Sequence, residues 1–292
     1  MTSEENCLYI SSRGFLKSCD IHSTTPQSSI SYLLNYDFDF ENKPDGTTIY
    51  VCSTAIQHFI NNIKHIKYKF VLVTGDADEC VPSEILRSET ELSDILNHPK
   101  LIHWYSQNCV YEHAKMTKIP IGLDYHTQAD MISPIDQEHI LKMMVSKVKP
   151  FWEREIKCYS NFHFVNYETM KFGYMRSHVI EAIPSELVFY EPVVIDRLES
   201  WENQSNYAFV LSPHGNGLDC HRTWEALILG CIPIVKKSPI DVLYEGLPVL
   251  IVDEWSEINE DLLKATVEKW KQIPISYYKL TLSYWINKIK QY

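Results

Sequence analysis

The sequence predicts an α/β protein built from two Rossmann-like halves, each with a parallel sheet. Short apolar runs typical of buried parallel strands alternate with stretches whose apolar residues recur at helical spacing. Polar loops follow several of these runs directly, as at 75–79, 122–126 and 212–217. The stretch 207–235 has the complete pattern of strand, glycine turn, helix and strand. Such alternation favours parallel sheets covered by helices.

The first half contains four expected strands after about 45 residues without a regular pattern. These strands are apolar, rich in β-branched residues and bounded by turn formers: 48–53, 69–74, 101–105 and 118–121. Helical spacing lies between them at 54–66 and 83–97. Residues 127–150 connect the two halves and include an expected amphipathic helix at 134–148.

The second half repeats the alternation. Strands are expected at 156–159, 187–190, 207–211, 231–235 and 248–252. Helical segments are expected at 169–182, 220–229, 240–244, from 253 onward, and at 277–292. Three of the nine glycines of the chain fall at 215, 217 and 230. Glycine used so sparingly elsewhere indicates a positive φ or a close backbone approach here, and Gly230 has the position of a helix C′ glycine. Asp219 is the expected N-cap of the helix.

Composition excludes several classes of function. The net charge of −11 argues against a general nucleic-acid binder, which needs a basic face. The eight cysteines form no CxxC pair and no zinc spacing, so we expect reduced thiols in a cytoplasmic setting and no metal. The N-terminus lacks signal-peptide features, and the longest apolar run, 226–235, is too short to span a membrane.

The loop at 212–217 has the features of an anion site. It follows a strand at the edge where open parallel sheets bind ligands, and it precedes a helix N-terminus that favours phosphate. Gly215 and Gly217 would let the backbone form an anion-binding nest. Arg222 in the first turn suits two-pronged contact with a diphosphate, and the Glu225 carboxylate suits the hydroxyls of a ribose.

Other interpretations of the same residues stay open. Arg222 and Glu225 also fit a plain surface ion pair, and Trp224 fits the core. A thiol–imidazole dyad at Cys220-His221 is disfavoured because adjacent helix residues do not face each other. A zinc site there lacks a fourth ligand.

The run SPHGNGLDCHRTWEALILGCIPIV (212–235) resembles the donor-binding segment of exostosin-like glycosyltransferases, and protein O-glucosyltransferases and α1,3-fucosyltransferases share weaker forms of it. That segment has approximately Ser-Pro-Arg-Gly, then Arg-x-x-Glu-Ala-Leu, then Gly-Cys-Ile-Pro-Val. The following KKSPIDVLYEGLPVLIVDEWSEI (236–258) also fits, and KIPIGLD (118–124) resembles the end of the first domain of such enzymes.

The resemblance implies a GT-B fold, in which two Rossmann-like domains face a central cleft. It implies an acceptor-side domain at 1–135, a donor-binding domain at 150–275, and a last helix at 276–292 that packs back on the first domain. Matching positions would place Arg222 on the donor diphosphate and Glu225 on the ribose, inside a loop formed by Ser212, Gly215, Asn216 and Gly217. His214 stands where the pattern has arginine, so either protonated His214 or Arg176 would supply the missing charge.

These families resemble inverting, metal-independent transferases, which need a base from the first domain. Asp76 is the preferred catalytic base, followed by Asp124, and Asp78 and His126 are further acceptor-side candidates. Each of these residues also fits a turn former or helix cap. The spacing of Asp76 and Asp78 matches a metal-binding DxD, but that motif belongs to a different transferase fold.

The expected function is transfer of a hexose or pentose from a UDP- or GDP-linked sugar to a hydroxyl of a glycan or protein, without a further cofactor. The alternative is a non-catalytic carbohydrate- or nucleotide-binding module on the same fold. Another doubly wound enzyme, such as a phosphatase or oxidoreductase, is disfavoured because GxGxxG, P-loop and GxSxG motifs are missing. Richness in Ile, Asn, Lys and Tyr hints at a microbe or a large DNA virus, and in the viral case at the host cytoplasm.

Overall fold

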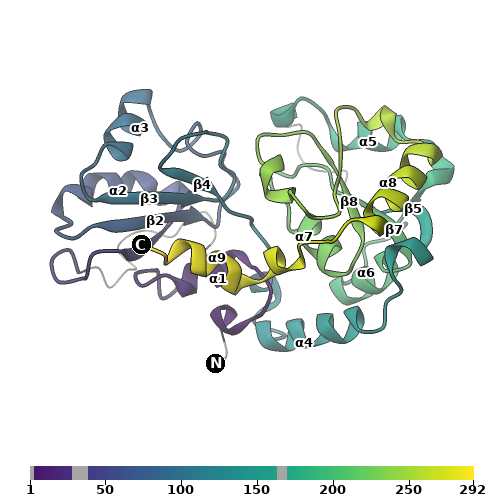
Figure 1. Ribbon diagram of the computed structural model, residues 1–292, viewed down its shortest axis with the longest axis horizontal. Helices are drawn as coiled ribbons and strands as arrows, with labels where there is room; N and C mark the ends of the chain where they lie inside the picture. The colour runs from purple at the N-terminus through teal and green to yellow at the C-terminus, as the bar shows by residue number, and fades with distance from the viewer. Residues whose placement is uncertain (1–2, 28–38, 163–169) are drawn as a thin grey trace. The chain divides into compact units, whose positions relative to one another are not determined.

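The structure is a computed structural model that describes residues 3–27, 39–162 and 170–292 (Figure 1). The chain divides into two compact units, each drawn from more than one segment. The first unit comprises Met1–Ile135, Gly217–Asp219 and Thr281–Tyr292, and the second comprises Asp136–Asn216 and Cys220–Leu280. Each unit contains one parallel sheet, as the sequence predicts for a two-domain Rossmann-like protein.

The first sheet has the strand order β1-β2-β3-β4, and all its pairs are parallel. Its strands are β1 (Thr47–Cys52), β2 (Phe70–Gly75), β3 (Leu101–Ser106) and β4 (Met116–Lys118). Every residue of β1 and β2 is buried, because helices cover both faces of the sheet. This explains why these strands appear in the sequence as continuous apolar runs rather than alternating ones.

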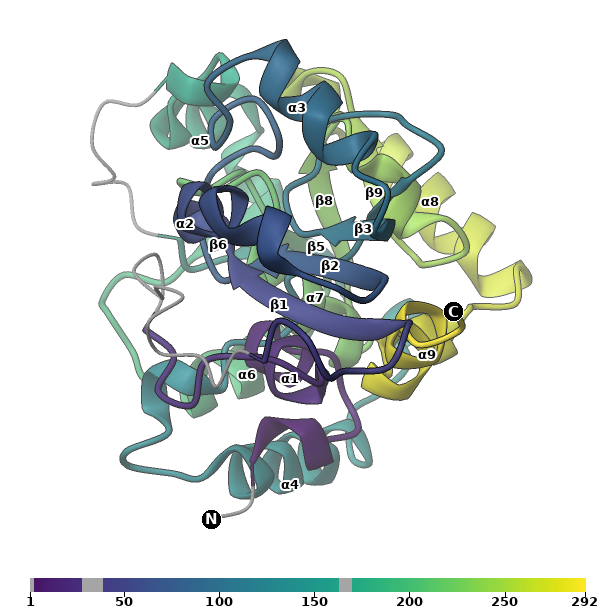
Figure 2. The same cartoon turned by 90° about the vertical axis from the view of Figure 1, so that its left-hand side faces the viewer.

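Two pairs of helices cover this sheet (Figure 2). One face carries α2 (Ile56–Asn62) and α3 (Glu89–Leu96), and the other carries α1 (Ser12–Ser18) and α9 (Leu282–Ile289). Helix α1 lies in the region expected to be irregular, where the Ser11 hydroxyl caps it by accepting from Gly14 N at 3.1 Å. Helix α3 begins later than expected because Ser88 caps it by accepting from Glu91 N.

The last segment of the chain packs within the first unit. Helix α9 buries Leu282, Trp285 and Ile289, a spacing that gives one apolar face. Gly14 of α1 permits close packing here, because a Cβ atom at Gly14 would lie 3.1 Å from Leu282 Cδ2. At the end of the segment, the Tyr292 ring stacks on His103 with 5.6 Å between centroids.

The second sheet has the strand order β6-β5-β7-β8-β9, again with only parallel pairs. Its strands are β5 (Glu155–Ser160), β6 (Val188–Tyr190), β7 (Tyr207–Leu211), β8 (Ile232–Lys236) and β9 (Leu250–Val252). After β5 the chain adds β6 on one side and then β7 on the other. The topological switch point therefore lies between β5 and β7, which is where open α/β sheets bind ligands.

Five helices accompany this sheet in the described part of the chain: α4 (Pro134–Val145), α5 (Arg176–Ala182), α6 (Arg197–Gln204), α7 (His221–Ile228) and α8 (Glu260–Gln272). Helix α6 was not expected from the sequence. The residues it buries are Ser200, Trp201 and Gln204, so it lacks the apolar stripe that marks a helix. Its start is nonetheless fixed, because the Asp196 carboxylate accepts from Glu199 N.

The two ends of α7 differ from each other in how well the sequence predicts them. Gly230 adopts φ +73 and ends the helix in a Schellman motif, as expected. Its N–H donates to Leu227 O at 3.1 Å, and Cys231 N donates to Ala226 O at 2.8 Å. At the other end the N-cap is Cys220, so the expectation of Asp219 is wrong. The Asp219 carboxylate instead accepts from Ile121 N at 2.8 Å within the first unit.

A buried arginine holds the C-terminal end of α7. Arg154 is 8% exposed, and its Nη2 donates to Leu229 O at 2.9 Å. Its Nη1 contacts Cys231 Sγ at 3.1 Å, and its Nε donates to Lys149 O at 2.6 Å. A cation at this position also stabilises the negative end of the helix dipole.

Gly230→Ala is expected to lower the free energy of unfolding by about 1–2 kcal/mol, because φ +73 disfavours a side chain. The new Cβ atom would also lie 3.1 Å from Arg154 Nη2. Gly173→Ala is the matched control, since Gly173 has φ +83 but no atom within 4 Å of an added Cβ. Urea unfolding of both variants should give the larger loss at Gly230, and equal losses would show that the Arg154 contact has no effect.

No disulfide joins any of the eight cysteines, all of which lie in the described ranges. Seven are buried and Cys220 is partly exposed. Among the helices that the structure describes, none is both long and apolar enough to cross a bilayer.

Candidate functional site

The candidate site lies at the carboxyl ends of β5 and β7, at the switch point of the second sheet. Strand β5 ends at Ser160 and leads to Phe162, and β7 ends at Leu211 and leads to Ser212. Helix α7 follows, with Arg222 in its first turn. The site therefore gathers a helix N-terminus and a guanidinium at the edge where this fold class binds ligands.

Two arginines approach the same aromatic ring. The guanidinium carbons of Arg222 and Arg176 lie 5.7 Å and 6.0 Å from the centroid of the buried Phe162 ring. The Arg222 Nη1 atom is buried and has no hydrogen-bond partner within residues 3–27, 39–162 and 170–292. Burial lowers the pKa of Arg222, and the nearby Arg176 lowers it further. An anion between the two guanidiniums would relieve both effects.

His214 is part of the structure of the loop rather than an exposed cation. Its ring is buried beside Phe172 and Tyr174, with centroids 5.0 Å and 6.0 Å away. The backbone N–H of His214 donates to the Tyr174 hydroxyl at 2.9 Å, and the backbone carbonyl of His214 accepts from Arg176 Nε at 3.0 Å. Burial raises the pKa of Tyr174, so its phenol stays protonated at neutral pH. Arg176, the first residue of α5, thus holds the loop and lies near Arg222.

The remaining loop residues have mainly structural contacts. Ser212 Oγ lies 2.8 Å from Thr223 Oγ1, and this buried contact ties the end of β7 to α7. Neither Gly215 nor Gly217 has a positive φ, so the expected nest at these glycines is wrong. Close approach does explain Gly217, because an added Cβ would lie 3.1 Å from Asn108 Nδ2. Asn216 is exposed, and its carbonyl accepts from Lys171 Nζ at 3.1 Å.

Glu225 faces a different arginine from the one expected. Arg197 Nε lies 3.9 Å from Glu225 Oε1, and each of the two side chains is 16% exposed. Arg197 Nη1 also donates to Gln137 Oε1 at 3.4 Å. The distance of 3.9 Å is that of a loose ion pair, so the carboxylate keeps capacity to accept hydroxyl hydrogens.

Sequence reasoning missed three basic residues around this site: Lys171, Arg197 and Lys236. Lys236 ends β8, and its Nζ lies 5.2 Å from the centroid of the Tyr174 ring and 2.9 Å from Glu254 Oε2. Lys236 was predictable in principle, because it ends an apolar strand run, whereas Arg197 begins the unexpected helix α6 and Lys171 lies in a short 3-10 turn.

In the first unit, Asp76 is buried and tightly held. It follows β2 in a left-handed conformation with φ 55, which is strained for a residue other than glycine. Its carboxylate accepts from Ser12 Oγ at 3.5 Å and lies 3.9 Å from Arg13 Nε. The Asp76 N–H donates to Gln107 Oε1 at 3.0 Å. With its side chain 2% exposed, Asp76 is poorly placed to receive a proton from an acceptor.

Asp124 and His126 form a pair in the first unit. Asp124 Oδ1 lies 3.1 Å from His126 Nδ1 and also accepts from Thr127 N at 3.0 Å. Asp124 is therefore a turn former, and it also orients the imidazole. The two side chains are 14% and 16% exposed, so they are more accessible than Asp76. Asp78 is exposed and lies beside Gly217.

The start of α1, with its N-cap Ser11, contacts the chain near both groups of candidates. Ser11 forms a parallel bridge with Leu123, directly before Asp124, while Ser12 and Arg13 contact Asp76. The carboxyl edge of the first sheet thus contains a histidine, an arginine and two carboxylates, of which Arg13 was not expected. This set offers proton transfer and charge stabilisation.

A scan against models of protein families and a search of curated proteins both find no match to this chain. The class of the protein is given by its fold and its candidate site. It is a two-unit, Rossmann-like α/β protein with an arginine pair at the switch point of its second sheet.

Proposed function

We propose that this protein is a glycosyltransferase of the GT-B class that uses a nucleotide-diphosphate sugar. One observation carries the proposal: the Nη1 atom of Arg222 is buried and has no hydrogen-bond partner among the described residues. Leaving a buried charged donor unsatisfied is costly, and a diphosphate supplies the missing acceptors. The likeness of 212–235 to exostosin-like donor segments supports the same ligand.

In the proposed reaction, Arg222 and Arg176 stabilise the departing nucleotide diphosphate. The bond from the sugar to the diphosphate breaks as the acceptor hydroxyl attacks, so negative charge grows on the leaving group. Two guanidiniums held near one aromatic ring are oriented before the reaction and need little rearrangement. The N-terminus of α7 adds partial positive charge. Glu225 would accept hydrogen bonds from the ribose.

The proposed base is His126, oriented by Asp124. An inverting transfer needs a group that takes the proton from the acceptor hydroxyl. Asp124 contacts His126 Nδ1, so the other ring nitrogen, Nε2, would accept that proton. This assignment replaces the preference for Asp76, which is less exposed and already contacts Arg13. Asp76 would then position Arg13 and the start of α1.

The test is a panel of UDP- and GDP-linked sugars added to the intact protein. Binding to the folded state raises its stability by about 2.7 kcal/mol at a hundred times Kd, so thermal unfolding reports affinity. We expect sugars linked to one of the two nucleotides, UDP or GDP, to raise Tm. When a hydroxyl acceptor is added, these sugars should release the nucleoside diphosphate. Binding without release would favour the non-catalytic module, and no shift with any donor would contradict the proposal.

A further inference from the structure

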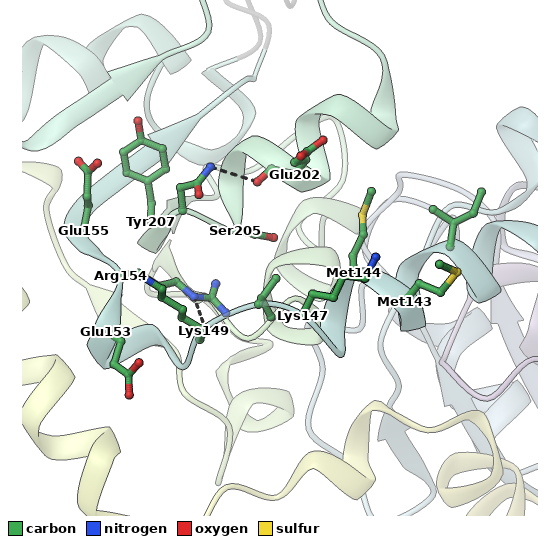
Figure 3. Close-up of a pocket in the computed structure, with 13 residues that line it drawn as sticks. Met143, Met144, Lys147, Lys149, Glu153, Arg154, Glu155, Glu202, Ser205 and Tyr207 are labelled. Carbon is green, nitrogen blue, oxygen red and sulfur yellow. Dashed lines mark hydrogen bonds between the residues drawn. The ribbon is translucent and has the colours of Figure 1, made fainter.

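A cavity lies within the second unit, lined by residues other than those of the candidate site (Figure 3). It has a volume of about 850 Å³, which is in the range of small-molecule sites. Glu155 and Tyr207, the first residues of β5 and β7, line it. The cavity is therefore at the amino ends of β5 and β7, and the candidate site is at their carboxyl ends. No residue of the candidate site lines it.

One wall is apolar and another is aromatic. Met144 and Val148 come from α4 and the segment that follows it. Tyr207 lies on the strand side, with its ring stacked on Phe189 at 5.5 Å and 17°. This contact fixes the orientation of the ring. Burial raises the pKa of Tyr207, so its hydroxyl stays protonated and both donates and accepts.

The polar groups around the cavity carry both signs of charge. Glu155 and Glu202 provide carboxylate acceptors, and Lys147 and Lys149 provide ammonium donors. Arg154 also lines the cavity, and its hydrogen bonds to Lys149 O and Leu229 O hold it in place. Ser205 and Asn206 add a hydroxyl and an amide. Neither a strongly anionic nor a strongly cationic ligand finds a matching field here.

We propose that this cavity binds a neutral oligosaccharide. Sugar hydroxyls donate to carboxylates such as Glu202 and accept from ammonium and amide groups. The C–H faces of pyranose rings pack against flat or flexible apolar groups, which Tyr207 and Met144 provide. This proposal is argued from the cavity alone and does not depend on nucleotide-sugar binding at the candidate site.

The experiment titrates maltotriose, cellotriose and chitotriose into the intact protein by calorimetry. At least one trisaccharide is expected to bind, and Glu202→Ala should weaken it about tenfold or more, because a hydrogen bond to a charged group is lost. Met144→Arg should block binding by filling the cavity. Both residues are at least partly exposed, so folding should survive. Glu199→Ala is the matched control, since Glu199 is an exposed glutamate on α6 that does not line the cavity.

Three results would overturn the inference: no binding of any trisaccharide, binding that neither Glu202→Ala nor Met144→Arg weakens, or tighter binding of inorganic phosphate or spermidine at this cavity. Excess uridine diphosphate should leave trisaccharide affinity unchanged, because the cavity is at the opposite edge of the sheet. Trisaccharide binding without any nucleotide binding would contradict the proposed function and leave this inference intact.

Discussion

Arg222→Ala is expected to weaken binding of uridine or guanosine diphosphate by about a hundredfold or more. A bidentate contact supplies two charge-assisted hydrogen bonds of about 1.5–3 kcal/mol each, and every 1.4 kcal/mol is about tenfold in Kd. The second guanidinium, Arg176, remains in the variant with its Nε donating to the carbonyl of His214, but it cannot occupy the position that Arg222 leaves. Calorimetric titration at one fixed salt concentration measures the change.

The same substitution is expected to leave the stability of the unliganded protein unchanged or to raise it. The Arg222 Nη1 atom is buried without a hydrogen-bond partner in the described ranges, so the alanine variant is relieved of a desolvation cost that offsets the lost contact with the Phe162 ring. Arg222→Lys should bind with intermediate affinity, because it keeps the charge and loses the two-pronged geometry. Arg87→Ala is the control, an exposed arginine of the first unit. Undiminished affinity in Arg222→Ala would remove this residue from the site.

His126→Ala is expected to lower the rate of sugar transfer by about a hundred to ten thousandfold, the usual contribution of a general base. Donor affinity should stay the same, because a general base acts on the acceptor hydroxyl and not on the donor. Asp124→Asn should give a smaller loss, since it weakens the orientation of the ring at Nδ1 without removing the ring. The rate of diphosphate release under saturating donor measures these effects.

Asp76→Asn separates the two assignments of the base. The variant keeps the size of the side chain and its contact with the Ser12 hydroxyl, and it loses the charge opposite Arg13. We expect a modest loss of activity, caused by movement of Arg13. A loss larger than that of His126→Ala would return the base to Asp76, despite the 2% exposure of its side chain.

The strands of both sheets were predictable except for the bounds of β4 (Met116–Lys118), because parallel strands buried on both faces leave continuous apolar runs such as that of β2. Gly230 was predictable for a similar reason, since a helix end in the left-handed region needs glycine. The short helices α1 and α6 were not. Helix α6 buries serine and glutamine beside Trp201, so its pattern carries no helical signal.

The site was predictable in part. Arg222, Arg176 and the loop follow from position in a strand–turn–helix pattern, and the pattern places them at one edge of the sheet. The contacts of Asp76 with Ser12 and Arg13 join residues far apart in the chain, and only the fold brings them together. The burial of His214 could not be predicted either, because it depends on ring contacts with Phe172 and Tyr174, which lie about 40 residues earlier in the chain.

The division of the first unit among distant segments has a consequence for how the protein is made. A ribosome delivers the chain from its N-terminus, and domains usually fold in the order in which they emerge. Here the first unit lacks α9, with the buried Trp285 and Ile289, until residues 281–292 have been synthesised. The second unit, which ends at Leu280, has all of its residues before then. The second unit should therefore be able to fold before the first unit is complete. Until α9 has been synthesised, the apolar surface of the first unit that α9 covers should stay exposed.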